Sequence, residues 1–562
     1  MTESIDIDAI PDDPDDPYWS SLPDWVTEFR PHQFDAVLEI VDAYRRGMQV
    51  VELDAPVGSG KTLIGEMVRV VLGGKGAYVC TTRSLQDQIA QDFDCAVVKG
   101  RANYPTILFD ELTAEDCTGT GCVYCPDRDD CPYQVALASY HAAPLGVANT
   151  AYLLGQINGG NPNAKITKGR ELVVIDECDE LESVLVGSVE VYVGERAIGD
   201  WGGTPLKKGV HTKTQIEWLR DHARLASEWA RAHGRTHDVE MRRKVARVRR
   251  LSAQMVQVAQ GITKDPDLWV REYSERRGRE TDAVMFKPVL VGEYGMSKLW
   301  RHAPRFLAMS GTIISPDQWS RDVGVIGGGQ DGVEPWGLEW EPVSVAMTFP
   351  VENRPIFYSP AADMKSGDRD TYEQRVSDMS DGIGKVVDKH DDSGILCHTV
   401  SYALTKRLYE KLTGRVPRDS GITRATRHGR TILTYTDAAS RDHALQAYVD
   451  EPGSVLLAPS MDRGIDLAGD LCRCVIVAKL PFPNLGDRRV AARMRLEGGQ
   501  NWYSMLTART LVQMTGRGVR SADDHATSYI LDAQFNGWHY KNKQLLPKWW
   551  RDALEPKPLG SL

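Results

Sequence analysis

Residues 51–62 read VELDAPVGSGKT and contain the A-x-x-x-x-G-K-T spacing of a phosphate-binding loop. A short apolar run leads into this loop, and apolar residues at helical spacing follow it. The loop therefore lies between an expected strand and an expected helix, which is the context that supports the motif. Glycines there let backbone N–H groups turn toward phosphate oxygens at a helix N-terminus. The sequence thus predicts a nucleotide site on an α/β domain.

The side chains of the loop predict individual contacts to the nucleotide. We expect Lys61 to reach the β- and γ-phosphates and the Thr62 hydroxyl to ligate Mg²⁺. Gln33, upstream in RPHQ, is a candidate for reading the adenine edge because an amide donates and accepts at once. A surface glutamine without such a role is the alternative. The remaining nucleotide contacts expected from the loop are Ala55, Pro56, Val57, Gly58, Ser59 and Gly60.

A second apolar run, ELVVIDE, ends in the acidic sequence DECD at residues 176–179. Downstream of a phosphate loop, we expect Asp176 to hold Mg²⁺ through water and Glu177 to orient and deprotonate the attacking water. For a lone acidic pair the alternative is a helix N-terminus, where the helix dipole favours negative charge. The combination with the loop favours the catalytic interpretation.

Strand and helix patterns alternate twice along the chain, on the two sides of about residue 335. This alternation predicts two α/β domains with parallel sheets, and a Gly-rich stretch at 324–332 reads as a linker. We assign residues 21–335 to the first domain, with insertions at 100–140 and 190–300, and residues 336–562 to the second. Residues 1–20 are expected to form a disordered acidic tail, since residues 1–16 hold seven acids and no base.

The second domain has no phosphate loop but carries QMTGRGVR at residues 513–520 and GIDLAG at residues 464–469. Arg517 and Arg520 share one face if the preceding helix persists, and we expect them to grip the γ-phosphate. Arginine fingers generally contribute on the order of 10³–10⁵ in rate. Surface arginines paired with carboxylates are the alternative. Gln513 completes this catalytic set, and Gly464 and Asp466 are further nucleotide contacts.

Two insertions in the first domain carry unusual composition. Residues 214–262 read as two helices with a break near Gly234, and the second helix is strongly basic. Its basic face suits either a solvated surface or a positive wall beside a nucleic-acid channel. Cys117, Cys122, Cys125 and Cys131 form the other cluster, with the spacing C-x4-C-x2-C-x5-C. Such crowding predicts a metal site rather than disulfides, and the spacing allows zinc or an iron–sulfur cluster.

Composition excludes some classes of protein. The chain of 562 residues contains no run of eighteen apolar residues, so no membrane span is expected. Its N-terminus lacks the basic-then-apolar pattern of a signal peptide, which predicts a cytoplasmic protein. The net charge of −11 does not exclude a nucleic-acid partner, because binding follows local basic patches.

The order of the motifs resembles the XPD/DinG family of superfamily 2 iron–sulfur DNA helicases. The stretches that carry the resemblance are, in chain order, RPHQ, APVGSGKT, TTRSLQDQ, KGRANYP followed by the four cysteines, VANTAYLL, DECD, MSGTI, ILCHTVSY, MDRGIDLAGD, LPFPNLGD and QMTGRGVR. They span nearly the whole chain beyond the acidic N-terminus.

This resemblance implies two RecA-like motor domains with ATP and Mg²⁺ in the cleft between them. It implies a [4Fe–4S] cluster rather than zinc on the four cysteines, and a helical arch at the basic hairpin. Single-stranded DNA would pass across both motors beneath the arch, usually 5′ to 3′, with forked duplex as the substrate and DNA repair or replication as the setting. A monomer is expected. Thr82, Arg83, Ser401 and Tyr402 are candidate DNA contacts from their motif positions.

Three positions depart from the family pattern. Cys178 and Asp179 replace the last two residues of DEAH, which bears on the coupling of hydrolysis to DNA. Arg463 replaces an acid, and Thr106 stands where the first cluster cysteine usually occurs. Cys117 is the candidate for the displaced ligand, with Cys95 as a substitute. The departures leave two other functions open, a translocase without strand separation and a zinc-bearing nucleic-acid binder with a degenerate motor.

Overall fold

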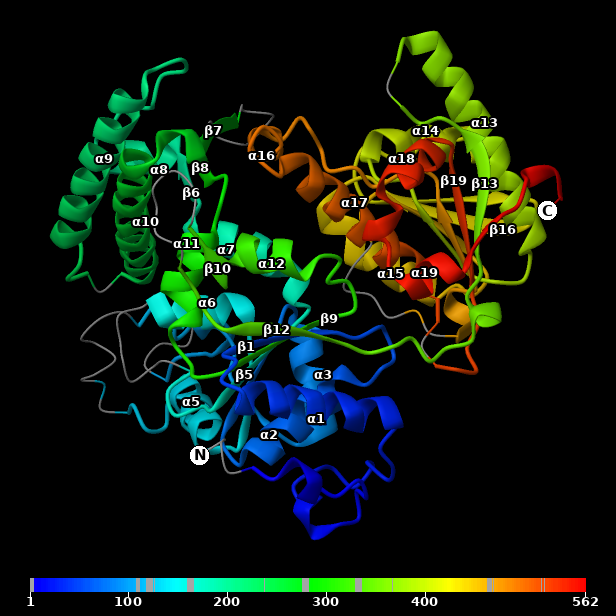
Figure 1. Ribbon diagram of the computed structural model, residues 1–562. Coiled ribbons are helices and arrows are strands. Elements are labelled where there is room, and N and C mark those ends of the chain that lie inside the picture. Colours follow the sequence, from blue (N-terminus) through cyan, green and yellow to red (C-terminus); the bar gives the residue numbers. More distant parts are fainter. Residues whose placement is uncertain are drawn as a thin grey trace.

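A computed structural model describes the chain apart from residues 1–4, 108–111, 118–124, 126, 159–165, 237, 275–282, 329–335, 366, 462–466, 468, 517, 520 and 562. Two α/β domains and a helical hairpin are the main parts, and they are separate in the ribbon (Figure 1). Among the described residues, no helix combines the length and the apolar character that a membrane crossing requires.

The first motor domain is built on a seven-stranded parallel sheet in the order β12-β1-β9-β5-β2-β4-β3. Adjacent residues of β2 enter different cores: Ala77 and Val79 join one hydrophobic cluster, while Tyr78 and Cys80 join the other. This period of two is what a sheet covered on both faces requires. The strands are β1 (Val50–Asp54), β2 (Gly76–Cys80), β3 (Ala96–Val97), β4 (Leu145–Asn149), β5 (Leu172–Asp176), β9 (Phe306–Ser310) and β12 (Trp340–Ser344).

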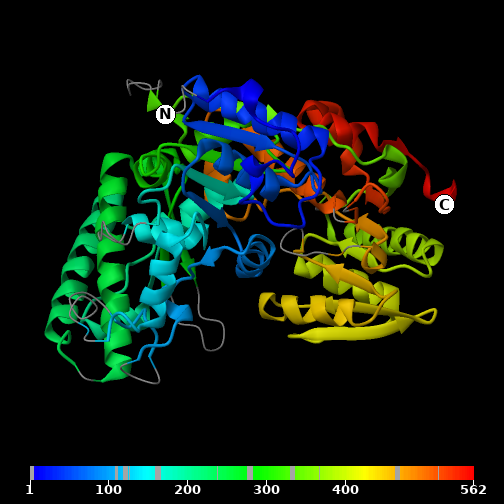
Figure 2. The ribbon, with the colours of Figure 1, turned by 90° about the horizontal axis from the view of Figure 1, so that it is seen from below.

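Helices cover both faces of this sheet (Figures 1 and 2). The helix α2 begins at the expected phosphate loop, and α7 follows the acidic motif after a short 3₁₀ turn. The helices that bear on the site are α1 (Pro31–Arg45), α2 (Lys61–Leu72), α3 (Arg83–Phe93), α5 (Pro132–Ala142), α6 (Thr150–Asn158), α7 (Leu181–Val189) and α12 (Pro316–Val323).

Strand β12 extends the first motor domain beyond the boundary expected at residue 335. It pairs in parallel with β1 along its whole length, from Val50 opposite Trp340 to Asp54 opposite Ser344. The chain therefore returns to the first sheet after the Gly-rich stretch before it enters the second domain. The boundary expected at residue 335 would assign this segment to the second domain, since a short strand carries no mark of its partner.

The expectation of a disordered acidic tail is wrong for residues 5–20. Trp19 is 1% exposed and packs edge-on against Phe29, and its indole N–H donates to the carbonyl of Pro11 at 2.9 Å. Asp6 and Asp16 cap two 3₁₀ turns through their carboxylates. The acids thus satisfy local backbone donors, and the aromatic residue anchors the segment on the first motor domain.

The second motor domain has an eight-stranded sheet in the order β15-β16-β17-β14-β18-β19-β13-β20. All its pairings are parallel except the β15–β16 hairpin at one edge. Its strands are β13 (Ile356–Ala362), β14 (Ile395–His398), β15 (Ile422–Arg427), β16 (Arg430–Tyr435), β17 (Val455–Ala458), β18 (Cys474–Val477), β19 (Thr527–Asp532) and β20 (Leu554–Pro556). The expected pair of parallel-sheet motor domains is confirmed.

The basic hairpin forms an arch beside the first motor domain. Its helices α9 (Thr212–Ala232) and α10 (Val239–Lys264) lie side by side (Figure 2) and share a hydrophobic core of their own. The base of the arch is an antiparallel sheet in the order β6-β8-β7, made of β6 (Val191–Gly194), β7 (Trp269–Ser274) and β8 (Ala283–Pro288). Figure 1 shows this base next to α16 (Arg488–Arg493) of the second motor domain.

Candidate nucleotide site between the motor domains

The phosphate loop owes its shape to two glycines. Gly58 and Gly60 have φ angles of 80° and 79°, in the left-handed region that glycine adopts without strain. Gly60 is also the N-cap of α2, so Lys61 starts the helix directly after the turn. A Cβ atom at Gly60 would collide with the side-chain amide of Gln33. The backbone conformation therefore favours glycine here, and any larger residue would also have to displace the Gln33 amide from the loop.

Gln33 braces this loop. Its Oε1 accepts from the backbone N–H of Arg30 at 3.0 Å, and its Nε2 donates to the carbonyl of Ser59 at 3.1 Å. Arg30 Nη1 donates to the carbonyl of Gly58 at 2.8 Å, which adds a second link from α1 to the loop. The side chain is buried. The structure thus gives Gln33 a loop-bracing role that sequence reasoning missed, and its contact to adenine stays a prediction.

The expected Mg²⁺ ligands lie on neighbouring elements and meet through Tyr78. The Tyr78 hydroxyl donates to Asp176 Oδ2 at 2.9 Å and lies 3.3 Å from Thr62 Oγ1. Lys61 Nζ donates to the carbonyl of Ala55 at 3.4 Å. A buried carboxylate beside a hydroxyl is an oxygen donor set of the kind that Mg²⁺ prefers. Tyr78 was missed from the sequence because an aromatic residue in a buried strand reads only as core.

Electrostatics also mark the site. Burial raises the pKa of Asp176, while the ammonium group of Lys61 acts in the opposite direction. Burial likewise raises the pKa of Asp54, at the end of β1, to about 7 against the lowering effect of Lys61. Carboxylates that are costly to ionise favour a bound cation, which stabilises their charged form. The residues present therefore fit a divalent cation.

Glu177 adopts a conformation that is uncommon for its residue type. Its φ of 50° lies in the left-handed region, and its backbone N–H donates to Asp176 Oδ1 at 2.9 Å. Such backbone strain concentrates at functional sites, where the surrounding structure holds it. The backbone hydrogen bond thus fixes the two acids in one turn. Asp176 is buried at the end of its strand, and Glu177 is half-buried.

Asp179 accepts hydrogen bonds from the second motor domain. Ser310 Oγ donates to its Oδ1 at 2.8 Å, and Gln513 Nε2 donates to its Oδ2 at 2.9 Å and to Thr312 Oγ1 at 3.0 Å. Arg509 Nη1 donates to its backbone carbonyl at 2.8 Å. Both Arg509 and Gln513 belong to α17 (Gly499–Thr515). We call these five residues the nucleotide-edge contact. The departure from DEAH thus leaves a bonded link between the motors.

Four of the predicted site residues of the second motor domain fall outside the described residues. Gly464, Asp466, Arg517 and Arg520 are in this group, together with Arg463. Their expected contacts to the γ-phosphate and nucleotide stay predictions. Within the described part of the chain, Gln513 Oε1 is buried and accepts no hydrogen bond, so this acceptor is left for a water molecule or a nucleotide.

Three of the four clustered cysteines are described, and Cys122 lies outside the described residues. Among the described cysteines, Cys117, Cys125 and Cys131 take part in no disulfide, and each is half-buried. The described residues contain no group of three or more His, Cys, Asp or Glu side chains that could hold a metal ion. The chemistry of the donor set, four thiols in one short segment, nevertheless fits a thiolate-bound zinc or iron–sulfur centre.

Arg101 of KGRANYP ties the two ends of the cysteine segment together. Its Nη2 donates to the carbonyl of Cys117 at 2.9 Å, and its guanidinium lies 5.0 Å from the ring centroid of Tyr133, just after Cys131. Cys95 lies elsewhere, packed on the core of the first motor domain, where burial raises the pKa of its thiol to about 12. Metal ligation needs a thiolate, so this placement does not favour Cys95 as a ligand.

The basic face of α10 contacts the cysteine segment. Arg243 forms an ion pair with Asp116 at 3.3 Å, and Arg250 forms one with Glu115. Both acids precede Cys117. Part of the charge of α10 is thus used to bind the neighbouring module, and a positive wall beside a nucleic-acid channel stays a prediction for the rest of its basic face.

The candidate DNA contacts occupy matching places in the two motor domains. Thr82 accepts from the backbone N–H of Leu85 and caps α3, directly after β2. Ser401 does the same for Leu404 at the start of α14 (Tyr402–Thr413), just after β14. Arg83 is exposed, and Tyr402 keeps 38% of its surface exposed. The geometry leaves these side chains at equivalent strand ends, and their contact with DNA stays a prediction.

Comparisons with known proteins agree with this architecture. The helicase C-terminal domain family matches residues 383–553. The ATP-dependent DNA helicase CHL1 of Saccharomyces cerevisiae is 29% identical over 143 residues, which are 21% of this chain and 16% of that protein. The regulator of telomere elongation helicase 1 homolog of Drosophila virilis is 32% identical over 130 residues, 21% of this chain and 13% of that protein. The aligned segment is thus a small share of these relatives.

Solved structures match over a much larger span. A structure described as XPD helicase has a TM-score of 0.61 at 15% identity, and covers 94% of this chain and 100% of its own. The structure of Xpd4 from S. tokodaii gives a TM-score of 0.55 at 13% identity with the same coverage. The protein therefore has the two-motor helicase fold. The helicase C-terminal domain match over residues 383–553 agrees with this fold, and both agree with the resemblance that the motif order carries.

Proposed function

We propose that the protein is an ATP-dependent DNA helicase that moves along single-stranded DNA from 5′ to 3′ and acts as a monomer on forked duplex. The observation that carries this proposal is the nucleotide-edge contact. In it, Gln513 and Arg509 of the second motor reach Asp179 in the acidic motif of the first. A nucleotide on the phosphate loop would then be sensed by both motors.

The chain's own residues divide the work of hydrolysis. Lys61 would neutralise charge on the β- and γ-phosphates, and Thr62 and Asp176 would hold the Mg²⁺ ion, with Tyr78 fixing both ligands. The bound metal ion would supply charge neutralisation on the phosphate oxygens. Glu177 would orient the attacking water and accept its proton. Arg517 and Arg520 would stabilise charge on the transferring phosphoryl group.

A strand-displacement assay tests this function. Forked duplexes with a 5′ or a 3′ single-stranded tail are mixed with the wild-type protein and ATP, and Lys61→Ala is the matched variant without the phosphate-binding ammonium group. We expect separation only with ATP, only from the 5′ tail, and only for the wild type. Vigorous DNA-stimulated hydrolysis with no separation on either tail would instead identify a translocase.

We further propose that Cys117, Cys122, Cys125 and Cys131 hold a [4Fe–4S] cluster with a structural role. The support is the donor set, the anchoring of the segment by Arg101 and the place of the segment in the family order. Anaerobic purification followed by iron, sulfide and zinc analysis tests this. We expect about four iron and four sulfide per chain. About one zinc per chain, without iron, would overturn the assignment.

A further inference from the structure

The short helix α16 leaves the body of the second motor domain and lies against the first. In Figure 1 it lies between the second motor and the base of the arch. Its partners come from α7 and α12 of the first motor and from β7 and β8 of the arch base. We call this group of contacts the α16 socket. None of the residues in it belongs to a motif used above.

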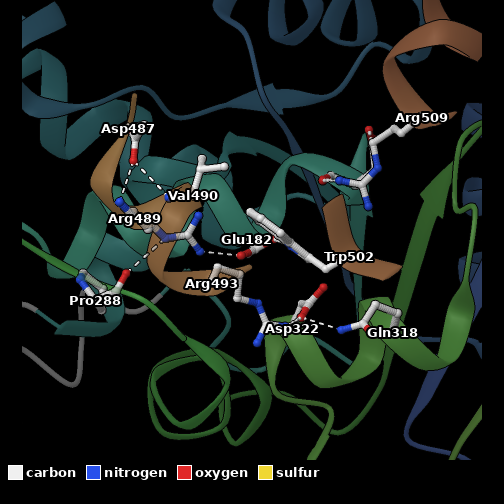
Figure 3. A network of polar contacts seen from close by, with 11 residues as sticks. Glu182, Pro288, Gln318, Asp322, Asp487, Arg489, Val490, Arg493, Trp502 and Arg509 are labelled. Carbon is white, nitrogen blue, oxygen red and sulfur yellow. Dashed lines mark hydrogen bonds and ion pairs between the residues drawn. The ribbon is translucent and has the colours of Figure 1, made fainter. Parts of the chain in front are cut away.

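Two carboxylates of the first motor face arginines of α16 (Figure 3). Glu182 pairs with Arg489, and the indole N–H of Trp502 donates to Glu182 Oε2 at 3.2 Å. Arg493 Nη2 lies 2.5 Å from Asp322 Oδ1. These side chains are buried or nearly so, with 13% or less of any charged member exposed. Buried charges are held in place because separating them leaves one without a partner.

The electrostatics of Glu182 follow from this packing. Burial alone would raise the pKa of Glu182, but the Arg489 guanidinium, supported by Arg493 and the Trp502 indole, outweighs it and lowers that pKa. The carboxylate is therefore charged at neutral pH, although the partners that stabilise it all come from the other motor domain. Its charge is satisfied only while α16 stays docked.

The same helix also contacts the arch base. Arg489 Nε donates to the carbonyl of Pro288 at 3.0 Å (Figure 3), and Arg488 Nη1 donates to the carbonyl of Arg271 at 2.9 Å. The backbone N–H of Arg488 donates to Glu272 Oε1 at 3.2 Å. Pro288 ends β8, while Arg271 and Glu272 lie on β7. Consecutive arginines of α16 thus bind both a motor carboxylate and the arch.

One rigid element connects this socket to the nucleotide edge. Helix α17 carries Trp502 near its start and Gln513 near its end. Trp502 bonds Glu182, and Gln513 bonds Asp179, three residues earlier in the chain. The turn that follows the acidic motif is therefore contacted by both ends of α17. A shift of the second motor at the nucleotide edge should therefore turn α16 within its socket, because α17 is one continuous helix between the two contacts.

We propose that α16 transmits the nucleotide state of the motors to the arch base, with Glu182 as the positioning residue that holds α16 in its socket. The proposal rests on the proposed function for its ATP site. Helix α16 stays docked and turns as α17 moves, so its contacts to β7 and β8 change with the nucleotide. The arch then responds to ATP without touching it.

Amide hydrogen exchange of the full chain tests this, with a non-hydrolysable ATP analogue and Mg²⁺ as the probe. In the wild type we expect slower exchange in peptides of the phosphate loop and a changed rate in peptides covering residues 269–274 and 283–288. Glu182→Gln keeps the side-chain size but not the charge, and should retain the loop response while losing most of the arch-base response. Glu293→Gln, in an exposed ion pair with Lys264, is the matched control and should keep both.

A second variant keeps the test decisive if Glu182→Gln folds poorly. Arg488→Ala removes an exposed side chain that donates a hydrogen bond to the arch base, and should also uncouple the base from the nucleotide. The proposal is overturned if the phosphate loop responds in the wild type while the arch base does not, or if the variants respond as the wild type does. No response at the phosphate loop of the wild type would instead sink the proposed function.

Discussion

The two motor domains meet at two places whose chemistry differs. At the nucleotide edge, the buried carboxylate of Asp179 accepts from an amide and a hydroxyl and lies 3.9 Å from the guanidinium of Arg509. In the α16 socket, Glu182 and Asp322 each face an arginine at close range, and burial together with the Glu182 carboxylate raises the pKa of Asp322 to about 7 against the lowering effect of Arg493. The nucleotide edge thus has one long ion pair beside neutral hydrogen bonds, whereas the socket has two close ion pairs, so separating the two motors should cost more at the socket. The motors should therefore open at the nucleotide edge and stay hinged at the socket.

The largest expected effect on stability lies in the socket. Arg493→Met keeps the bulk of the side chain but leaves Asp322 without its cation. We expect a loss of about 3 kcal/mol, because removing one partner of a buried pair strands the other. Thermal unfolding measures this, and Glu293→Ala, in an exposed pair, should cost less than about 0.5 kcal/mol. Equal losses for the two variants would erase the distinction between the socket and an ordinary surface pair.

The nucleotide edge should show its effect in rate rather than in stability. Lys61→Ala removes the ammonium group at the start of α2, and we expect ATP hydrolysis to fall at least ~10²-fold, equivalent to about 2.7 kcal/mol of transition-state stabilisation. Its melting temperature should stay close to that of the wild type. Steady-state hydrolysis and a thermal melt on the same preparation check both. Hydrolysis that survives the change would remove the phosphate loop from the mechanism.

The stability of the protein should depend on pH through Glu52, which contacts the helix that carries Asp322 of the socket. Glu52 on β1 accepts from Ser320 of α12, the helix that carries Asp322. Burial raises the pKa of Glu52 from its ordinary 4.5 to about 8. The folded protein thus holds this proton more tightly than the unfolded chain, so stability falls as pH rises from about 4.5 to about 8.

Glu52→Gln cannot ionise, so it should be more stable than the wild type above pH 8, by ~2 kcal/mol or more, and should lose this advantage near pH 5. Melting temperatures of the two proteins over that range measure the difference. A constant difference across the range would mean that Glu52 does not titrate in the folded protein.

Among the contacts between the two motor domains, the smaller effect on stability is expected at Gln513. Gln513→Ala removes an amide that bonds Asp179 and Thr312 but leaves no unpartnered charge away from solvent, so the cost should be under ~1 kcal/mol. The same thermal melt, run beside Arg493→Met, gives the comparison directly. A loss as large as that of Arg493→Met would show that the two contacts are equally rigid.

Local sequence patterns predicted the parts of the site that depend on short spacing. The phosphate loop and the strand that ends at Asp176 each fit in a dozen residues, and the buried runs around them indicated parallel sheets. The role of Tyr78 was not predicted. The alternation of residues along the strand indicates that Tyr78 is buried, but not that its hydroxyl contacts Thr62 and Asp176. Its role exists only once three elements have been packed together.

Long-range pairings explain the other failures. Asp179 and Gln513 are separated by 334 positions, and Arg250 and Glu115 by 135. A short window of sequence does not show that a basic helix will form ion pairs with acids so far away. Nor does it show that an unusual acidic motif will keep its hydrogen bond to the second motor domain. The prediction of a disordered N-terminus failed for a related reason. The packing of its few apolar residues, such as Trp19, outweighed the effect of its charge.

The most direct test of the account is whether the second motor domain completes the ATP site. ATP hydrolysis by Gln513→Ala is measured at saturating single-stranded DNA, and kcat and KM are separated. We predict that kcat falls about tenfold or more while the affinity for ATP changes by less than about twofold, because the amide acts after binding. A variant that hydrolyses ATP as fast as the wild type would contradict a site shared between the two motors.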